Sequence, residues 1–206
     1  MNIGLVTSYL IAGIILLAML SMNMSVSHSS NEITLSQVTR ERATTISDMM
    51  TNDMLKMGYN RKSKTSPILT TANNNKIEFR SNIDNSTDNS VEIVTWEFTS
   101  SAITNTTNPN DRLLLRTIRD ASTGSIISQD SIKSGVIKFQ FSYYNDYGKP
   151  RSDSMSTPVS ASNLASIKQI YVSFKLQYGE KIDNSSPSRY VTTIWEKRFS
   201  PPNLEL

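Results

Sequence analysis

MNIGLVTSYLIAGIILLAMLSMNM (residues 1–24) begins the chain, and this stretch contains no charged side chain. Residues 3–20 are almost all apolar, and a helix needs about 20 such residues to cross the hydrocarbon core of a bilayer. The first proline is Pro67, so no helix-breaking residue of that kind interrupts a helix that starts here. We therefore expect residues 1–24 to form a transmembrane anchor that contacts lipid through residues 3–24.

A cleaved signal peptide is the alternative interpretation of this segment. Signal peptides begin with basic residues and end with small residues at a cleavage site. No Lys or Arg precedes the apolar run, and LSMN at 20–23 lacks the small-residue pattern. We expect the segment to be retained. Its orientation is not indicated by charge, because the first basic residues, Arg40 and Arg42, lie far from the run.

Residues 25–58 continue the helix as an amphipathic stalk. Their apolar side chains recur at spacings of three, four and seven, which places them on one broad face. Gly58 is a plausible C-cap, so the helix should end there, and residues 59–67 should form a polar linker. The residues expected to pack this stalk against a sheet are Ile46, Met49, Met50 and Met57.

From residue 68 the apolar period changes from helical to two, which predicts a β-rich domain over 68–206. Strand-like runs, rich in β-branched and aromatic residues and bounded by Asn, Asp, Gly, Pro and Ser, occur at 76–80, 90–98, 112–118, 135–144, 167–178 and 190–199. Each element has one apolar face to bury. We therefore predict an α+β fold, with the long helix packed on an antiparallel sheet of about six strands.

Composition excludes several classes of function. The net charge of +3 is small and scattered, which argues against a nucleic-acid partner. The chain has no Cys, so it has no disulfide framework, thiolate metal site or cysteine nucleophile. His28 is the only histidine, and we expect it to be an exposed stalk residue. A general base of the histidine type must lie close to a nucleophile. We therefore expect no enzymatic activity, catalytic residue or cofactor.

Two clusters of acidic residues are candidates for a functional site: Asp48 with Asp53, and Asp84 with Asp88. Asp48 and Asp53 lie five residues apart on a helix and point in different directions, so we expect a solvated helix face with one buried tether at most. Asp84, Ser86 and Asp88 imitate the start of a calcium-binding EF-hand loop, but the sixth position is Asn89 and not Gly. We expect Asp84 and Asp88 to serve a turn between strands, and we predict no metal site.

Small and polar residues occur near the start of the apolar helix. Association of helices in a bilayer relies on close packing at small residues and on polar contacts. Ser8, Ala12 and Gly13 lie roughly on one side of the helix and are the candidate residues for helix association. Tolerance of Gly and Ser in membrane helices is the alternative explanation.

The order of these segments resembles the minor pilins and pseudopilins of type IV pili and type II secretion systems, in particular the larger minor pilins. The resemblance covers nearly the whole chain as an architecture of loose motifs. It implies a pilin fold, an inner-membrane single-pass anchor with the C-terminal domain periplasmic or extracellular, other pilin-like subunits as partners, and a role in assembling, priming or capping a filament. The segments that carry it are 48–60, 75–98, RLLLR (112–116), FQFSYYNDYGK (139–149), 167–176 and PPNLEL (201–206).

The N-terminus departs from the pilin pattern. Pilin precursors carry a basic leader ending in Gly, then an apolar helix with Glu at its fifth position. Here Ile3 precedes Gly4, and the fifth residue counted from Leu5 is Tyr9. Two interpretations remain: a pilin-like protein that is never cleaved at Gly4, or a chain whose leader has been altered.

Two classes of function follow from the sequence. In the first, the chain is a membrane-anchored subunit that assembles, primes or caps a pilus or pseudopilus. In the alternative, the chain is an anchored extracytoplasmic β-domain that binds a ligand or exoprotein through loops 99–111 and 145–163.

Overall fold

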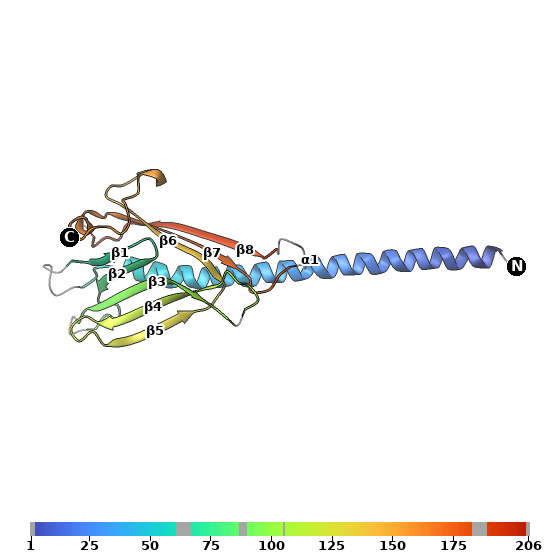
Figure 1. Cartoon of the computed structure of the whole chain (residues 1–206), viewed down its shortest axis with the longest axis horizontal. Helices are drawn as coiled ribbons and strands as arrows, with labels where there is room; N and C mark the ends of the chain where they lie inside the picture. Colours follow the sequence, from blue (N-terminus) through green and yellow to red (C-terminus); the bar gives the residue numbers. More distant parts are fainter. Residues whose placement is uncertain (1–2, 61–66, 87–89, 105, 183–188, 205–206) are drawn as a thin grey trace.

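The computed structural model describes residues 3–60, 67–86, 90–104, 106–182 and 189–204. Within these residues it is an α+β protein with one long N-terminal helix followed by antiparallel strands (Figure 1). The helix α1 spans Ile3–Leu55. The strands are β1 (Leu69–Ala72), β2 (Lys76–Ser81), β3 (Glu92–Ala102), β4 (Arg112–Asp120), β5 (Ile126–Ile132), β6 (Val136–Tyr144), β7 (Gln169–Gln177) and β8 (Thr192–Phe199), and short 3-10 helices η1 (Arg151–Asp153) and η2 (Ala161–Ser166) lie between β6 and β7.

The first half of α1 projects from the rest of the protein as a free rod (Figure 1). Every side chain from residue 3 to residue 34 is exposed. The most apolar 18-residue window of the helix has 0% of its residues buried. By length and composition this segment can cross a membrane.

The second half of α1 is packed. Its buried residues recur every three or four positions, which places them on one face of the helix. The helix ends at Leu55, and the chain turns at Gly58, which has a φ of +72°. A Cβ at Gly58 would lie 3.0 Å from side-chain atoms of Ile68 and Asn203, so the turn requires glycine on two counts. The buried residues of α1 are Thr39, Ala43, Ile46, Met50, Asp53 and Met54.

The strands form two antiparallel sheets, and not the single sheet of about six strands expected from the sequence. One sheet has the order β1-β2-β3-β4-β5, and the other has the order β6-β7-β8. Both sheets gather around the C-terminal half of α1 (Figure 1) and share one hydrophobic core with it. The helix contacts β7 and β8 of the smaller sheet and, through Asp53, β3 and β4 of the larger one.

Each of the six expected strands is present, and two more were missed. β1 has only four residues and directly follows the expected linker at 59–67, of which 61–66 lie outside the described residues. β5 has the sequence IISQDSI and is exposed or half-exposed along its whole length. Because β5 is an edge strand with little apolar surface to bury, its sequence lacks the alternation that marks a half-buried strand.

Gly135 marks the point where the chain leaves the first sheet and begins the second. Its φ is +81°, and an added Cβ would lie 2.0 Å from the carbonyl oxygen of Gln177. Its own carbonyl accepts a hydrogen bond from the Gln177 amide, 2.8 Å away. This close approach to β7 is open only to glycine and directs β6 to pair with β7.

Candidate functional site

A buried carboxylate joins the helix to the larger sheet. The side chain of Asp53 on α1 has 0% of its surface exposed, and it accepts three hydrogen bonds. Arg116 on β4 donates two of them, from Nε to Oδ2 at 2.7 Å and from an Nη to Oδ1 at 2.9 Å. Trp96 Nε1 on β3 donates the third to Oδ2 at 2.8 Å. Asp53 is thus the one buried tether that the sequence allowed for, while Asp48 is exposed.

The partners of Asp53 form one row across the sheet. Ile77, Trp96, Arg116 and Asp130 are successive cross-strand partners on β2, β3, β4 and β5. Directly paired residues point to the same face of a sheet. Arg116 therefore reaches Asp53 on one side and Asp130 Oδ2 on the other, the latter at 3.1 Å. The hydrogen bonds of Asp53, followed by its charge, raise the pKa of the Arg116 guanidinium against the opposing effect of burial.

The residues expected to pack the helix occupy that interface. Ile46, Met50 and Met57 are at most 2% exposed, and Met49 is half-buried against the same core. Met57 lies just beyond the helix, in the turn that leads to Gly58. Trp96 and Tyr143 are fully buried and belong to the core.

The residues expected to mediate helix association lie on the free half of α1, and all three are exposed. Ser8 and Ala12 are four residues apart and share a face. Gly13 is turned by about 100° from Ala12 and about 140° from Ser8, so it lies away from that face, contrary to the expectation that all three share one side. The Ser8 hydroxyl donates to the Gly4 carbonyl at 2.8 Å, so this polar group is satisfied within its own helix.

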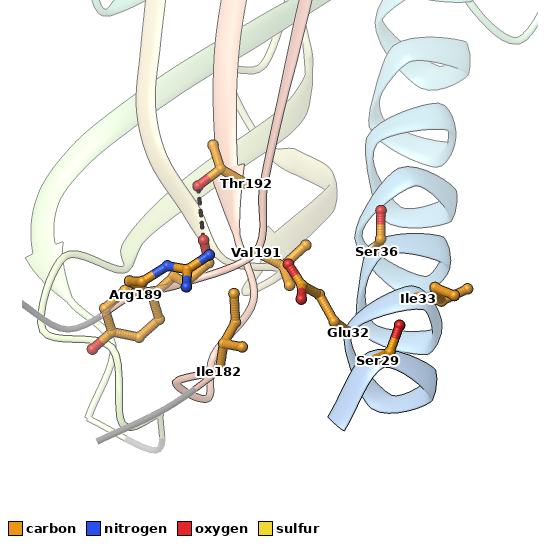
Figure 2. Close-up of a pocket in the computed structure, with 9 residues that line it drawn as sticks. Ser29, Glu32, Ile33, Ser36, Ile182, Arg189, Val191 and Thr192 are labelled. Atoms are coloured by element: carbon orange, nitrogen blue, oxygen red, sulfur yellow. Dashed lines mark hydrogen bonds between the residues drawn. The ribbon is translucent and has the colours of Figure 1, made fainter. Parts of the chain in front are cut away.

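A groove of about 590 Å³ opens where the helix leaves the β-domain (Figure 2). One wall is about two turns of α1, and the other is formed by Ile182 and the residues that lead into β8. Figure 2 shows the side chains of Glu32 and Arg189 reaching toward each other from the two walls. Sequence reasoning did not identify this groove, because its walls lie about 150 residues apart in the chain. The lining residues are Ser29, Glu32, Ile33, Ser36, Ile182, Arg189, Tyr190, Val191 and Thr192.

The loop between β3 and β4 fastens the two sheets together. Asn108 is fully buried and donates to the Gln177 side chain at 2.9 Å, and the Thr107 hydroxyl donates to the Gly179 carbonyl. Loop 99–111, one of the two expected ligand-binding loops, is thus held against the smaller sheet. Loop 145–163, the other, is held by amide hydrogen bonds from Met155 to Tyr143 and from Val159 to Ala72.

Asp111, at the end of loop 99–111, is fully buried. Neither carboxylate oxygen has a hydrogen-bond partner among the described residues. Burial raises the pKa of Asp111, and the nearby Thr106 hydroxyl, Arg42 and Arg112 offset only part of that effect. The Thr106 hydroxyl is directed to the Asn108 carbonyl at 3.3 Å. The ionised Asp111 carboxylate therefore carries a desolvation cost that its surroundings offset only in part.

The remaining sequence candidates do not assemble into a site. Asp84 Oδ1 accepts the Ser86 amide at 3.0 Å in a local turn, and Asp88 lies outside the described residues. His28 is exposed on the free half of the helix. No group of three or more His, Asp or Glu side chains with metal-binding geometry occurs in the part of the chain that the structure describes.

Comparison with known proteins adds no relative: no family model, curated protein or solved structure matches the chain.

Asp53→Asn should lower the free energy of unfolding by about 3 kcal/mol, because it leaves the Arg116 guanidinium buried beside a neutral amide. Thermal unfolding of the full chain in detergent measures this change. Asp48→Asn, an exposed substitution on the same helix, should have almost no effect. The double variant Asp53→Asn/Arg116→Met should lose less stability than Asp53→Asn alone, because the buried guanidinium is removed and the charge left behind, Asp130, has a side chain that is 44% exposed. Equal losses in the Asp48 and Asp53 variants would contradict the assigned role.

Asp111→Asn should stabilise the protein at pH 7 by about 1 kcal/mol, because a buried neutral amide costs less than a buried unpaired charge. The pKa of Asp111 is raised in the folded state, so the unfolded state ionises first as pH rises. Wild-type stability therefore falls as pH rises from 3.8, the ordinary value for an aspartate, up to the raised folded value. The advantage of the Asn variant should accordingly disappear below pH 3.8, and unfolding curves across pH measure it.

Asp120→Asn is the matched control, because the pKa of Asp120 is lowered in the folded state whereas that of Asp111 is raised. Hydrogen bonds from Ser122 and Thr123 lower the pKa of Asp120 from 3.8 to about 2. Its charge stabilises the folded state above pH 3.8, and that contribution is lost as pH falls through about 2. The control should therefore be slightly less stable than wild type at pH 7 and equal to it at low pH. The same pH trend in both variants would refute the assignment for Asp111.

Proposed function

We propose that this chain is a membrane-anchored, pilin-like subunit that assembles, primes or caps a type IV pilus or type II secretion pseudopilus. The proposed partners are other pilin-like subunits, reached through the apolar half of α1 and the β-domain around its other half. The proposed location is the inner membrane, with a single span and the C-terminal domain in the periplasm or outside the cell.

One observation carries the proposal, namely the division of a single helix into two unlike halves. Residues 3–34 of α1 have only exposed side chains, although 3–20 are mostly apolar. The rest of the same helix supplies part of the hydrophobic core. An apolar surface of this length is costly in water and favourable in a bilayer or against another apolar helix. A rigid continuous helix transmits any contact made in the membrane to the β-domain.

Association within the bilayer must come from packing. Residues 3–31 of the apolar half include no carboxylate, and the first is Glu32. Helices in lipid gain little from the hydrophobic effect on meeting each other, so they associate through small residues that allow close approach. Ser8 and Ala12 provide such a surface, and the hydroxyl of Ser8 needs no partner outside its own helix.

Replacing Ser8 and Ala12 together with Leu tests the proposal. The double variant should insert into membranes as wild type does, because it only adds apolar surface. Its cross-linking to neighbouring pilin-like subunits, measured in native membranes, should be lost, because the bulkier side chains hold the helices apart.

Val6→Leu/Leu10→Phe is the matched control, since it adds bulk on the opposite face of the helix. The control should cross-link as wild type does. Unchanged cross-linking of the Ser8→Leu/Ala12→Leu variant would contradict the assembly function. It would instead support the alternative, in which the helix is only a tether and the β-domain binds a ligand or exoprotein through loops 99–111 and 145–163.

A further inference from the structure

We infer that β5, the edge strand of the larger sheet, binds an extended segment of a partner protein that pairs with it as an added antiparallel strand and carries a Lys or Arg opposite Asp130. An aliphatic residue of the segment lies three or four positions after its basic residue. The inference concerns the β-domain and does not depend on the membrane anchor. It is carried by an unpaired strand edge, a row of charges that ends at Asp130, and two exposed isoleucines.

The outer edge of β5 has no strand partner in the part of the chain that the structure describes. β5 is the last strand in the order β1-β2-β3-β4-β5, so it pairs with β4 on one side only. Figure 1 shows it at the margin of the larger sheet. Alternate N–H and C=O groups of an edge strand point away from the sheet, and an added strand satisfies them. The ligand that suits this edge is therefore an extended polypeptide, and the sheet is antiparallel throughout.

The three other edges of the two sheets are covered or charged. Beside β1, η2 packs against the strand and the Val159 amide donates to the Ala72 carbonyl at 2.9 Å. On β6, the Phe141 amide donates to the Asn74 carbonyl at 2.7 Å. β8 contacts α1 and carries Lys197, and lysine on an edge strand opposes pairing with another chain.

β5 lacks these protections. Its sequence, IISQDSI, contains no Lys, Arg or Pro. Ile126 and Ile127 at its start are 55% and 59% exposed, and Ile194 is the only other exposed large aliphatic side chain in the described part of the β-domain. An aliphatic residue on the added strand covers this surface, which is why the inferred segment includes one.

The row of charges across the larger sheet is incomplete at β5. Arg116 donates to Asp53 on the helix and to Asp130 Oδ2 at the sheet edge, so two carboxylates share one guanidinium and the row has a net charge of −1. The side chain of Asp130 is 44% exposed, and its Oδ1 accepts no hydrogen bond within the described residues. A Lys or Arg directly opposite Asp130 on an added strand would reach that oxygen and neutralise the row.

The same charge disfavours a second copy of this chain at the edge. If two β5 strands pair antiparallel over their full length, Gln129 lies opposite its own counterpart, because it is the middle residue of Ile126–Ile132. The two Asp130 carboxylates then become diagonal neighbours on one face, with no added cation between them. The partner is therefore a segment of different sequence.

A peptide titration of the full chain in detergent tests the inference. The probe is the fluorescein-labelled peptide Thr-Val-Thr-Lys-Thr-Thr-Val-Val, which places its Lys opposite Asp130 and its last two Val residues near Ile126 and Ile127. Fluorescence anisotropy should show saturable binding. The same peptide with Glu in place of Lys should bind about tenfold more weakly, because it loses a charge-assisted hydrogen bond.

Two N-methylated forms of the lysine peptide separate strand pairing from simple charge attraction. Methyl groups on one set of alternate amides remove the donors that face β5, whereas methyl groups on the complementary set leave those donors in place. One form should therefore fail to bind, and the other should bind as the unmodified peptide does. Equal binding of the two forms would overturn the inference.

Asp130→Asn should lower the affinity for the lysine peptide about tenfold and remove its advantage over the glutamate peptide. Asp146→Asn is the matched control, because it removes an exposed carboxylate from the loop between β6 and β7. The control should bind both peptides as wild type does. Absence of saturable binding to wild type, or wild-type affinity in the Asp130→Asn variant, would contradict the assigned partner.

Hydrogen–deuterium exchange locates the bound peptide. Exchange should slow at residues 126–132 when the lysine peptide binds and should stay unchanged at β1 and β8. Protection at β1 or β8 in place of β5 would overturn the inference. Protection of residues 126–132 that rises with protein concentration in the absence of peptide would show a second copy at this edge, and would overturn it as well.

Discussion

The buried contact of Asp53 with Arg116 and Trp96 is the constraint on which the arrangement of this protein depends. It is made by a fully buried carboxylate, so the helix cannot slide along the sheet by a turn without leaving Asp53 or Arg116 unpaired. Because α1 is continuous from Ile3 to Leu55, fixing Asp53 also fixes how far the apolar half projects from the β-domain. The length of that projection therefore depends on one ion pair near the far end of the helix.

The two sheets contact the helix in different ways. The larger sheet supplies the polar contact through β3 and β4, and the smaller one lies against α1 through β7 and β8. Loop 99–111 joins them through Asn108 and Gln177. The same loop carries Asp111, whose buried carboxylate has no hydrogen-bond partner among the described residues.

The sequence predicts the helix and most strands, but it does not predict which strands pair with each other or which side chains form the buried ion pair. The helix follows from one uncharged run joined to an amphipathic one, and six strands follow from a period of two. The second sheet begins with a close approach of Gly135 to Gln177, which no local sequence pattern reports. Arg116 did leave a signal: it lies between Leu114 and Ile118 on the inward face of a strand, which predicts a buried anion. Asp53 could not be named as that anion, because the pairing joins residues 63 positions apart.

In the proposed arrangement, the free half of α1 lies in a bilayer and the groove lies just outside it. Because the chain has no Cys, single cysteines introduced at each position from 5 to 34 can be labelled in intact membranes with a membrane-impermeant maleimide. The account predicts a continuous protected block that ends near Met24 and full reactivity from His28 onward. Equal reactivity along the whole stretch, or a protected block that extends past Glu32, would contradict it.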